Sequence, residues 1–104
     1  ESVREEEEEE KVEIKEFEIS GSEFSFKPSS ITVKAGQKVK IIFENKGSVS
    51  HNLVIKDLGV ITKTIGNGQK DSVEFTASTP GKFDIICSVP GHKEAGMKAE
   101  LTIE

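Results

Sequence analysis

Three scarce residues with sulfur or nitrogen donor atoms lie five positions apart near the C-terminal end of the chain. The stretch CSVPGHKEAGM, residues 87–97, contains the only cysteine, Cys87, the only methionine, Met97, and one of the two histidines, His92. The other histidine, His51, stands 36 residues before Cys87. Together they offer a thiolate, two imidazoles and a thioether. That is the donor set of a trigonal copper site with a long axial methionine, of the kind that transfers single electrons.

Other metal sites and catalytic arrangements would use fewer of these four residues. Structural zinc takes four Cys or His ligands and accepts methionine poorly, while calcium and magnesium take clusters of oxygen ligands. A cysteine nucleophile with a histidine base would leave Met97 and one histidine without a role. A lone cysteine is also often a small buried apolar residue and nothing more. The copper site is the interpretation that uses every Cys, His and Met of the chain.

The segments that must position these residues have the period of β-strands. Apolar and polar residues alternate between turn residues, and no segment keeps a helical period. We expect strands at 12–19 with a continuation through Phe24 and Phe26, and at 31–33, 39–45, 51–55, 72–78, 82–87 and 97–104, with a long crossing connection over 56–71. Seven or eight short strands predict an all-β fold, a two-sheet antiparallel Greek-key sandwich.

In such a sandwich, residues 87–97 form a loop between the last two strands at one end of the molecule. Loops on a rigid β scaffold commonly carry binding residues. The fold can also bring His51, at the start of an earlier strand, next to this loop. We expect His51 to be buried in the sandwich and His92 to present its ring edge at the surface.

Length and charge predict one domain with an acidic tail. The 104 residues suit a single domain, and no apolar run approaches the roughly 20 residues of a membrane-spanning helix. The first ten residues hold seven Glu and one Arg, a net charge of −6, which leaves +1 for residues 11–104 within the total of −5. We expect residues 1–11 to be a flexible acidic tether and residues 12–104 a single domain. Basic clusters and aromatic platforms are missing, which argues against a nucleic-acid partner.

The pattern C-x4-H-x4-M after a strand, with an upstream His-Asn pair, resembles the cupredoxin family of type 1 blue copper proteins over roughly residues 17–104. The loop spacing is similar to that of the rusticyanin and auracyanin type and longer than that of plastocyanin. The resemblance implies an eight-stranded Greek-key sandwich, one copper ion that alternates between Cu(I) and Cu(II), and an electron-shuttle role outside the cytoplasm.

Two further features of the chain bear on its source and location. Because the chain begins with Glu, we interpret it as a processed or engineered form. The resemblance implies a periplasmic or extracytoplasmic location, where an upstream segment could tether the protein to a membrane. Lys and Glu dominate the charged residues while Cys and Met are scarce, which is typical of proteins from thermophiles.

The resemblance also assigns the ligands. His51, Cys87 and His92 would be the strong equatorial ligands, and Met97 would be the weak axial ligand. Ser50 would stand where some family members bring a backbone carbonyl toward the other side of the metal.

Three further residues would surround the cysteine ligand. By the resemblance, Asn52 and Ser88 tie together the two ligand-bearing segments, and the backbone N–H of Asn52 points at the Cys87 sulfur. The alternative for Asn52 is a turn-capping residue. In relatives with long loops, the N–H two residues after the cysteine gives the sulfur a second hydrogen bond, and here that residue is Val89. Such hydrogen bonds tune the reduction potential of the metal.

An apolar patch around His92 would be the docking face for a transient protein redox partner, such as a cytochrome, a terminal oxidase or a copper reductase. Its residues are Val89, Pro90, Gly91, Ala95 and Gly96, with Leu58 and Val60 from the long connection. Encounters of this kind bury little area and dissociate quickly, and we expect the protein to be a monomer.

We therefore predict an electron-transfer protein and not an enzyme. Catalytic type 2 or type 3 copper would need further histidines, and a binuclear centre would need a second cysteine. A periplasmic copper chaperone or storage protein is the alternative function, although such proteins tend to use Met-rich or exposed sites. A metal-free adhesion module is a further alternative, which predicts no copper uptake.

Overall fold

The long strands of the structure have the alternation of apolar and polar residues that was expected from the sequence. The computed structural model describes residues 14–104, and in β4 (Lys38–Asn45) and β9 (Lys98–Ile103) every second side chain is buried. The other strands are β1 (Ile14–Ser22), β2 (Ser25–Lys27), β3 (Ser30–Val33), β5 (Val54–Ile55), β6 (Val60–Ile61), β7 (Lys70–Thr76) and β8 (Gly81–Ile86), and a 3-10 helix, η1, spans Lys56–Leu58. The tether expected at residues 1–11 and the expected strand start at Val12 lie outside the described residues.

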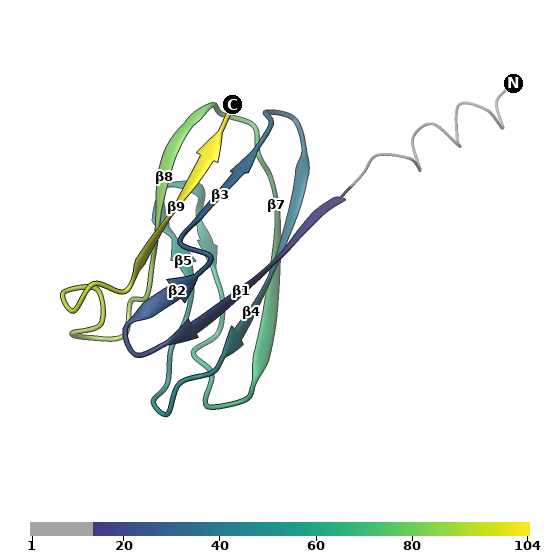
Figure 1. The fold of residues 1–104 in the computed structure, drawn as a ribbon. Coiled ribbons are helices and arrows are strands. Elements are labelled where there is room, and N and C mark those ends of the chain that lie inside the picture. Colours follow the sequence, from purple (N-terminus) through teal and green to yellow (C-terminus); the bar gives the residue numbers. More distant parts are fainter. Residues whose placement is uncertain (1–13) are drawn as a thin grey trace, which may run out of the picture.

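Two sheets pack face to face (Figure 1). One has the strand order β2-β1-β4-β7 and the other the order β3-β9-β8-β5-β6. The expected all-β, two-sheet sandwich is confirmed, but both sheets are mixed, since β1 pairs with β4 and β3 pairs with β9 in parallel. The β1–β4 pair is parallel because the chain passes through the opposite sheet, as β3, before it returns as β4. A crossing connection of this kind allows parallel neighbours, which a hairpin does not.

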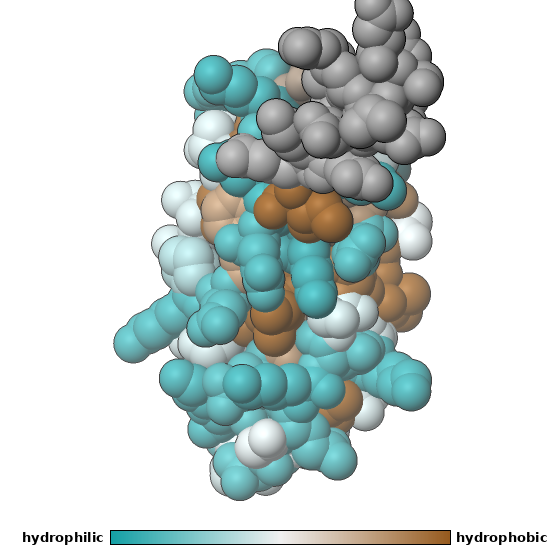
Figure 2. Space-filling view, turned by 90° about the vertical axis from the view of Figure 1, so that its right-hand side faces the viewer, coloured by the Kyte–Doolittle hydropathy of each residue, from teal (hydrophilic) through white to brown (hydrophobic). Residues whose placement is uncertain are grey.

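The core lies between the sheets and is built from their inward side chains. Phe43 of β4 and Leu101 of β9 are completely buried, and Ile19 of β1 stands in register with Phe43. Phe26 packs edge-to-face on Phe43, with ring centroids 5.9 Å apart. On the face shown in Figure 2, the described residues are mainly hydrophilic and the apolar side chains form small separate patches. The scaffold is therefore a close-packed apolar layer with a solvated exterior.

The connection between residues 56 and 71 has more structure than expected. η1 is followed by β6, which pairs antiparallel with β5, and His51 forms an isolated bridge with Ile65. His51 thus precedes β5 by three residues instead of opening that strand. Two-residue strands are too short for an alternating pattern to reveal. Hydrogen bonds in both directions between the His51 and Ile65 backbones (3.1 and 2.9 Å) fix the histidine at one end of the sandwich.

Candidate metal centre

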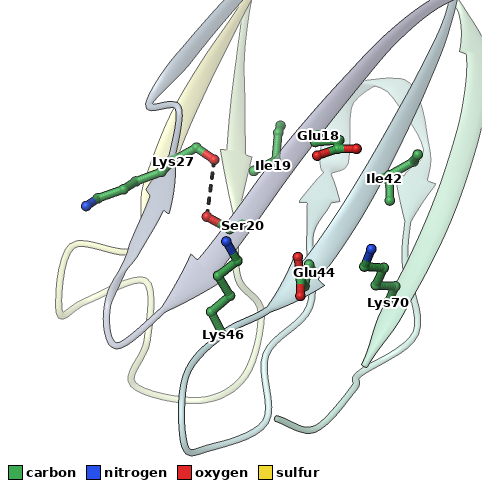
Figure 3. Close-up of a pocket in the computed structure, with 8 residues that line it drawn as sticks. All are labelled: Glu18, Ile19, Ser20, Lys27, Ile42, Glu44, Lys46 and Lys70. Carbon is green, nitrogen blue, oxygen red and sulfur yellow. Dashed lines mark hydrogen bonds between the residues drawn. The ribbon is translucent and has the colours of Figure 1, made fainter. Parts of the chain in front are cut away.

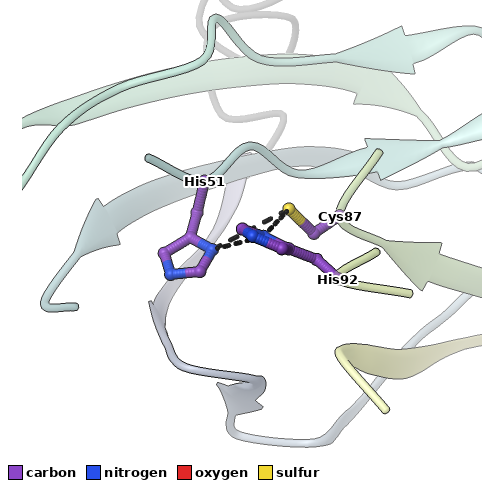
Figure 4. A group of neighbouring side chains, drawn as sticks. All are labelled: His51, Cys87 and His92. Atoms are coloured by element: carbon purple, nitrogen blue, oxygen red, sulfur yellow. Dashed lines mark hydrogen bonds between the residues drawn. The ribbon is translucent and has the colours of Figure 1, made fainter. Parts of the chain in front are cut away.

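Three donor atoms meet at the end of the sandwich where β8 finishes. Figure 4 shows the rings of His51 and His92 beside the sulfur of Cys87. Nδ1 of His92 lies 3.4 Å from Sγ, Nδ1 of His51 lies 3.9 Å from Sγ, and the two Nδ1 atoms are 3.1 Å apart. All three donor atoms lie within 4.8 Å of one another. The same ring nitrogen of each histidine is therefore available on the side of the sulfur.

Met97 lies at the far end of the ligand loop, beside both of the other loop ligands. Its N–H donates to the His92 carbonyl (3.1 Å), and its carbonyl accepts from the Cys87 N–H (3.4 Å). The Met97 side chain is completely buried. Gly21 of β1 leaves it room, because a Cβ at Gly21 would stand 3.0 Å from the Met97 methyl group and 2.7 Å from the Phe43 ring. The four expected ligands are thus together, with the thioether in the core.

Backbone hydrogen bonds within residues 87–97 shape the ligand loop. The N–H of His92 donates to the Val89 carbonyl (3.0 Å), and the N–H of Ala95 donates to the carbonyls of Gly91 and His92 (3.1 Å each). Successive tight turns therefore fold the loop back, so that the His92 ring lies beside Cys87. Figure 1 shows this loop, in olive, projecting beside the turn between β1 and β2. Cys87 and His51 are fully buried, while His92 is half-buried.

Asn52 ties the two ligand-bearing segments together. Its Nδ2 donates to Ser88 Oγ and its Oδ1 accepts from the Ser88 N–H, both at 2.8 Å. Its backbone N–H donates to Cys87 Sγ at 3.5 Å. Asn52 is buried, so water cannot easily replace these bonds. The tie between the segments that the resemblance implied is present in the structure.

We expect Asn52→Ala to lower the free energy of unfolding of the apoprotein by about 1–3 kcal/mol, because it removes two hydrogen bonds and leaves the Ser88 N–H without its acceptor. Denaturant unfolding followed by circular dichroism measures the loss. Ser88→Ala is the matched control, since it keeps the bond from the backbone N–H of residue 88 and should cost clearly less. Equal losses in the two variants would contradict the role given to the Asn52 amide.

The Val89 N–H does not donate to the Cys87 sulfur as the resemblance implied. Within residues 14–104 the N–H group that donates to Cys87 Sγ is that of Asn52, and Val89 gives no such bond. The expectation of a second hydrogen bond to the sulfur is corrected accordingly. Ser50 is exposed next to His51, and a metal contact of its carbonyl stays a prediction.

Sequence reasoning missed two neighbours of the histidines, Glu23 and Phe24, in the turn between β1 and β2. Glu23 Oε1 lies 3.0 Å from His51 Nε2. The rings of Phe24 and His92 make an edge-on contact, with their centroids 4.9 Å apart. Hydrogen bonds from the Ser48 hydroxyl, from His51 and from the Ser48 backbone lower the pKa of Glu23 to about 2. The one sequence signal is a charged residue within an apolar alternation. It does not reveal a partner 28 positions away.

A pocket on the outer face of the four-stranded sheet lies apart from this cluster (Figure 3). It is lined by Glu18, Ile19, Ser20, Lys27, Ile42, Glu44, Lys46 and Lys70. It contains none of the candidate ligands, and its mixture of lysines and carboxylates is typical of a solvated sheet face. This pocket is therefore separate from the candidate metal centre.

The donor atoms fit one copper ion in spacing and in type. Bonds of about 2.0–2.3 Å from nitrogen and sulfur to a first-row metal place neighbouring donors roughly 3–4 Å apart. The observed separations of 3.1, 3.4 and 3.9 Å lie in that range. A thiolate with two imidazoles and a weak thioether suits copper in both oxidation states. His51, Cys87 and His92 would hold the ion, with Met97 as the weak fourth ligand.

Comparisons with known proteins identify the family. Residues 3–103 match the model of the cupredoxin-like domain. The chain is 36% identical to plastocyanin A/B of Petroselinum crispum over 87 residues, which cover 75% of this chain and 86% of that protein. The chain therefore belongs to the cupredoxin-like family, and its cofactor is one copper ion.

Two other similar proteins extend this picture. The copper-resistant cuproprotein CopI of Rubrivivax gelatinosus is 26% identical over 99 residues, covering 75% of this chain and 59% of CopI. Dithionite-reduced auracyanin from the photosynthetic bacterium Roseiflexus castenholzii has a similar structure, with a TM-score of 0.77 and 25% sequence identity over 86% of this chain and 96% of that chain. The resemblance to the cupredoxin family that the sequence motif carried is thereby confirmed.

Proposed function

We propose that this protein is a small blue copper protein that shuttles single electrons between redox partners. The supporting observation is the convergence of His51, Cys87 and His92 with a buried Met97 at a site that the protein's own hydrogen bonds fix. Bound copper supplies a one-electron couple between Cu(II) and Cu(I). An electron carrier needs ligands that move little when the charge of the centre changes by one.

The chain holds its ligands from several directions. The His51 backbone is bonded to Ile65, and its ring is bonded to Glu23. Cys87 directly follows β8 of the five-stranded sheet, and its sulfur accepts the Asn52 N–H. Because His51, Cys87 and Met97 are completely buried, the side chains around them also exclude water. Small ligand movement and exclusion of water both favour rapid electron transfer over ligand exchange.

The exposed edge of the centre is the surface best suited to partner docking. His92 is the least buried of the four ligands, and Phe24 beside it is 40% exposed. The surrounding loop residues are the exposed Pro90, Gly91, Ala95 and Gly96 and the half-buried Val89. We propose that these residues and Phe24 form the docking surface. Such small apolar surfaces suit transient encounters.

The two residues that the sequence analysis added from the long connection have different positions. Leu58 of η1 is half-buried and packs against the core. Val60 of β6 is only 7% exposed and belongs to the core itself. Val60 therefore offers almost no surface, and we omit it from the proposed docking face. Val60 is placed there by the pairing of β5 with β6. A strand of two residues is too short to be recognised in the sequence.

The partners and the location are part of the proposal. A cytochrome, a terminal oxidase or a copper reductase outside the cytoplasm, for example in the periplasm, would suit a monomeric carrier with a small docking face. Among residues 14–104 there is no helix with the length and apolar character needed to cross a membrane.

A copper-handling function is the second candidate, and the similarity to CopI favours it. A chaperone or store must release its ion, which is easier from an exposed site with few ligands. Here three of the four ligand side chains are fully buried, which favours the carrier.

Two rates separate these functions. For a carrier we expect fast electron self-exchange between the oxidised and reduced proteins, measured by NMR line broadening, and slow loss of Cu(I) to an added chelator. Rapid transfer of copper to the chelator, together with slow self-exchange, would support copper handling and overturn the carrier proposal.

A further inference from the structure

The outer nitrogen of the buried histidine ligand faces a carboxylate. His51 is 0% exposed, and its Nδ1 lies on the side of the Cys87 sulfur. The opposite ring nitrogen, Nε2, lies 3.0 Å from Glu23 Oε1. Glu23 belongs to the turn between β1 and β2, so a segment remote from all four ligands in sequence reaches the copper site.

The protein holds this carboxylate in place independently of the histidine. The Ser48 N–H donates to Oε1 at 3.1 Å and to Oε2 at 2.9 Å, and the Ser48 hydroxyl donates to Oε2. The preceding residue, Gly47, is buried. A Cβ on Gly47 would overlap the Glu23 carboxylate and stand 3.0 Å from His51 Nε2. Gly47 and Ser48 thus form a cradle that fits a carboxylate and aims one oxygen at the histidine.

The donors around Glu23 determine the state of the histidine ring. The Ser48 backbone N–H can only donate, so the carboxylate acts as the acceptor there. It is also an acceptor for His51, which must then carry its proton on Nε2. That tautomer leaves the lone pair of Nδ1 on the side of the cluster. Carboxylate partners of histidine ligands are known to fix ring orientation and to make the ligand more basic.

We propose that Glu23 positions His51 and sets the charge next to the copper centre, so that it lowers the reduction potential of this protein. A negative charge near the ion favours Cu(II), which carries one more positive charge than Cu(I). The side chain of Glu23 is 31% exposed, so solvent screens part of this effect. The inference rests on the copper centre of the proposed function. It predicts an effect of the Glu23 charge on the reduction potential, which a purely structural contact would not have.

The experiment compares the copper-loaded wild type with Glu23→Gln and Glu18→Gln by redox titration. In Glu23→Gln the new amide oxygen can still accept from His51, so the main change is the loss of charge. We expect this variant to shift the balance between Cu(I) and Cu(II) roughly tenfold toward Cu(I), a rise of about 59 mV for one electron. Glu18→Gln removes the same charge from the outer sheet face of Figure 3 and should change the balance much less.

A second readout tests the positioning role without copper and without a variant. Long-range ¹H–¹⁵N correlation spectra of the wild-type apoprotein report the tautomer of His51. We expect the proton on Nε2. A proton predominantly on Nδ1 would overturn the proposal, even if Glu23→Gln failed to fold or to take up copper.

The outcomes also separate this inference from the proposed function. If the wild type forms a blue centre with a reversible potential, but Glu23→Gln and Glu18→Gln have the same potential, Glu23 does not set the charge of the centre and only this inference fails. If the wild type forms no blue copper centre, the proposed function fails first.

Discussion

Cys87→Ser is expected to abolish the blue charge-transfer band while leaving a folded protein. The band requires a copper–thiolate bond, and Cys87 is the only thiol of the chain. Serine is close to cysteine in size, and its hydroxyl oxygen can still accept the Asn52 N–H that now reaches Sγ at 3.5 Å. We expect the variant to lose roughly 1–2 kcal/mol of stability, in the ordinary range for a single buried substitution.

Visible absorption after addition of Cu(II) measures the band, and circular dichroism checks the fold. Ser88→Ala is a suitable control, because it changes the neighbouring residue but keeps the thiolate and should remain blue. A blue Cys87→Ser protein would mean that the band does not arise from a bond between copper and Cys87.

Removal of copper is expected to produce the largest change in thermal stability. The expected ligands lie on separate segments, His51 after β4 and the other three at the β8–β9 connection, so a bound ion would link parts of the chain that separate on unfolding. With free copper at roughly 1,000 times its Kd, the gain is about 4 kcal/mol. For a domain of this size, that corresponds to a rise in Tm of roughly 15–30 °C.

Calorimetry of the apoprotein and the Cu(I) protein under reducing conditions measures this shift. Cys87→Ser should show a much smaller shift in the same experiment. Identical Tm values for the apoprotein and the loaded wild type would show that copper does not bridge these segments.

The candidate ligand set could be selected from the sequence because its residue types are rare. Cys87 and Met97 each occur once, and the strand pattern around them placed the loop at an end of a β sandwich. The long strands, such as β4, could be predicted because one face is buried and the other is solvated. Asn52 and Ser88 followed from the family resemblance and not from any periodicity.

The remaining features depend on the three-dimensional path of the chain. Glu23 reaches His51 only because the β1–β2 turn comes to the same end of the sandwich as the ligand loop. Charged residues are common in turns, so the residue type alone does not indicate that Glu23 contacts a candidate ligand. The Val89 N–H gives the sulfur no hydrogen bond, and the spacing of the ligand loop alone cannot predict this. The parallel β1–β4 pair likewise depends on how the chain crosses between sheets.

The most direct test of the account is a titration of the apoprotein with Cu(II), followed by visible and EPR spectroscopy. The grouping of His51, Cys87 and His92, with the buried Met97 as the expected fourth ligand, predicts uptake of one copper per chain, an intense blue band and an unusually narrow parallel copper hyperfine splitting. A colourless product, a broad hyperfine splitting, or a stoichiometric preference for zinc when both metals are offered would contradict a type 1 copper centre and the electron-carrier function built on it.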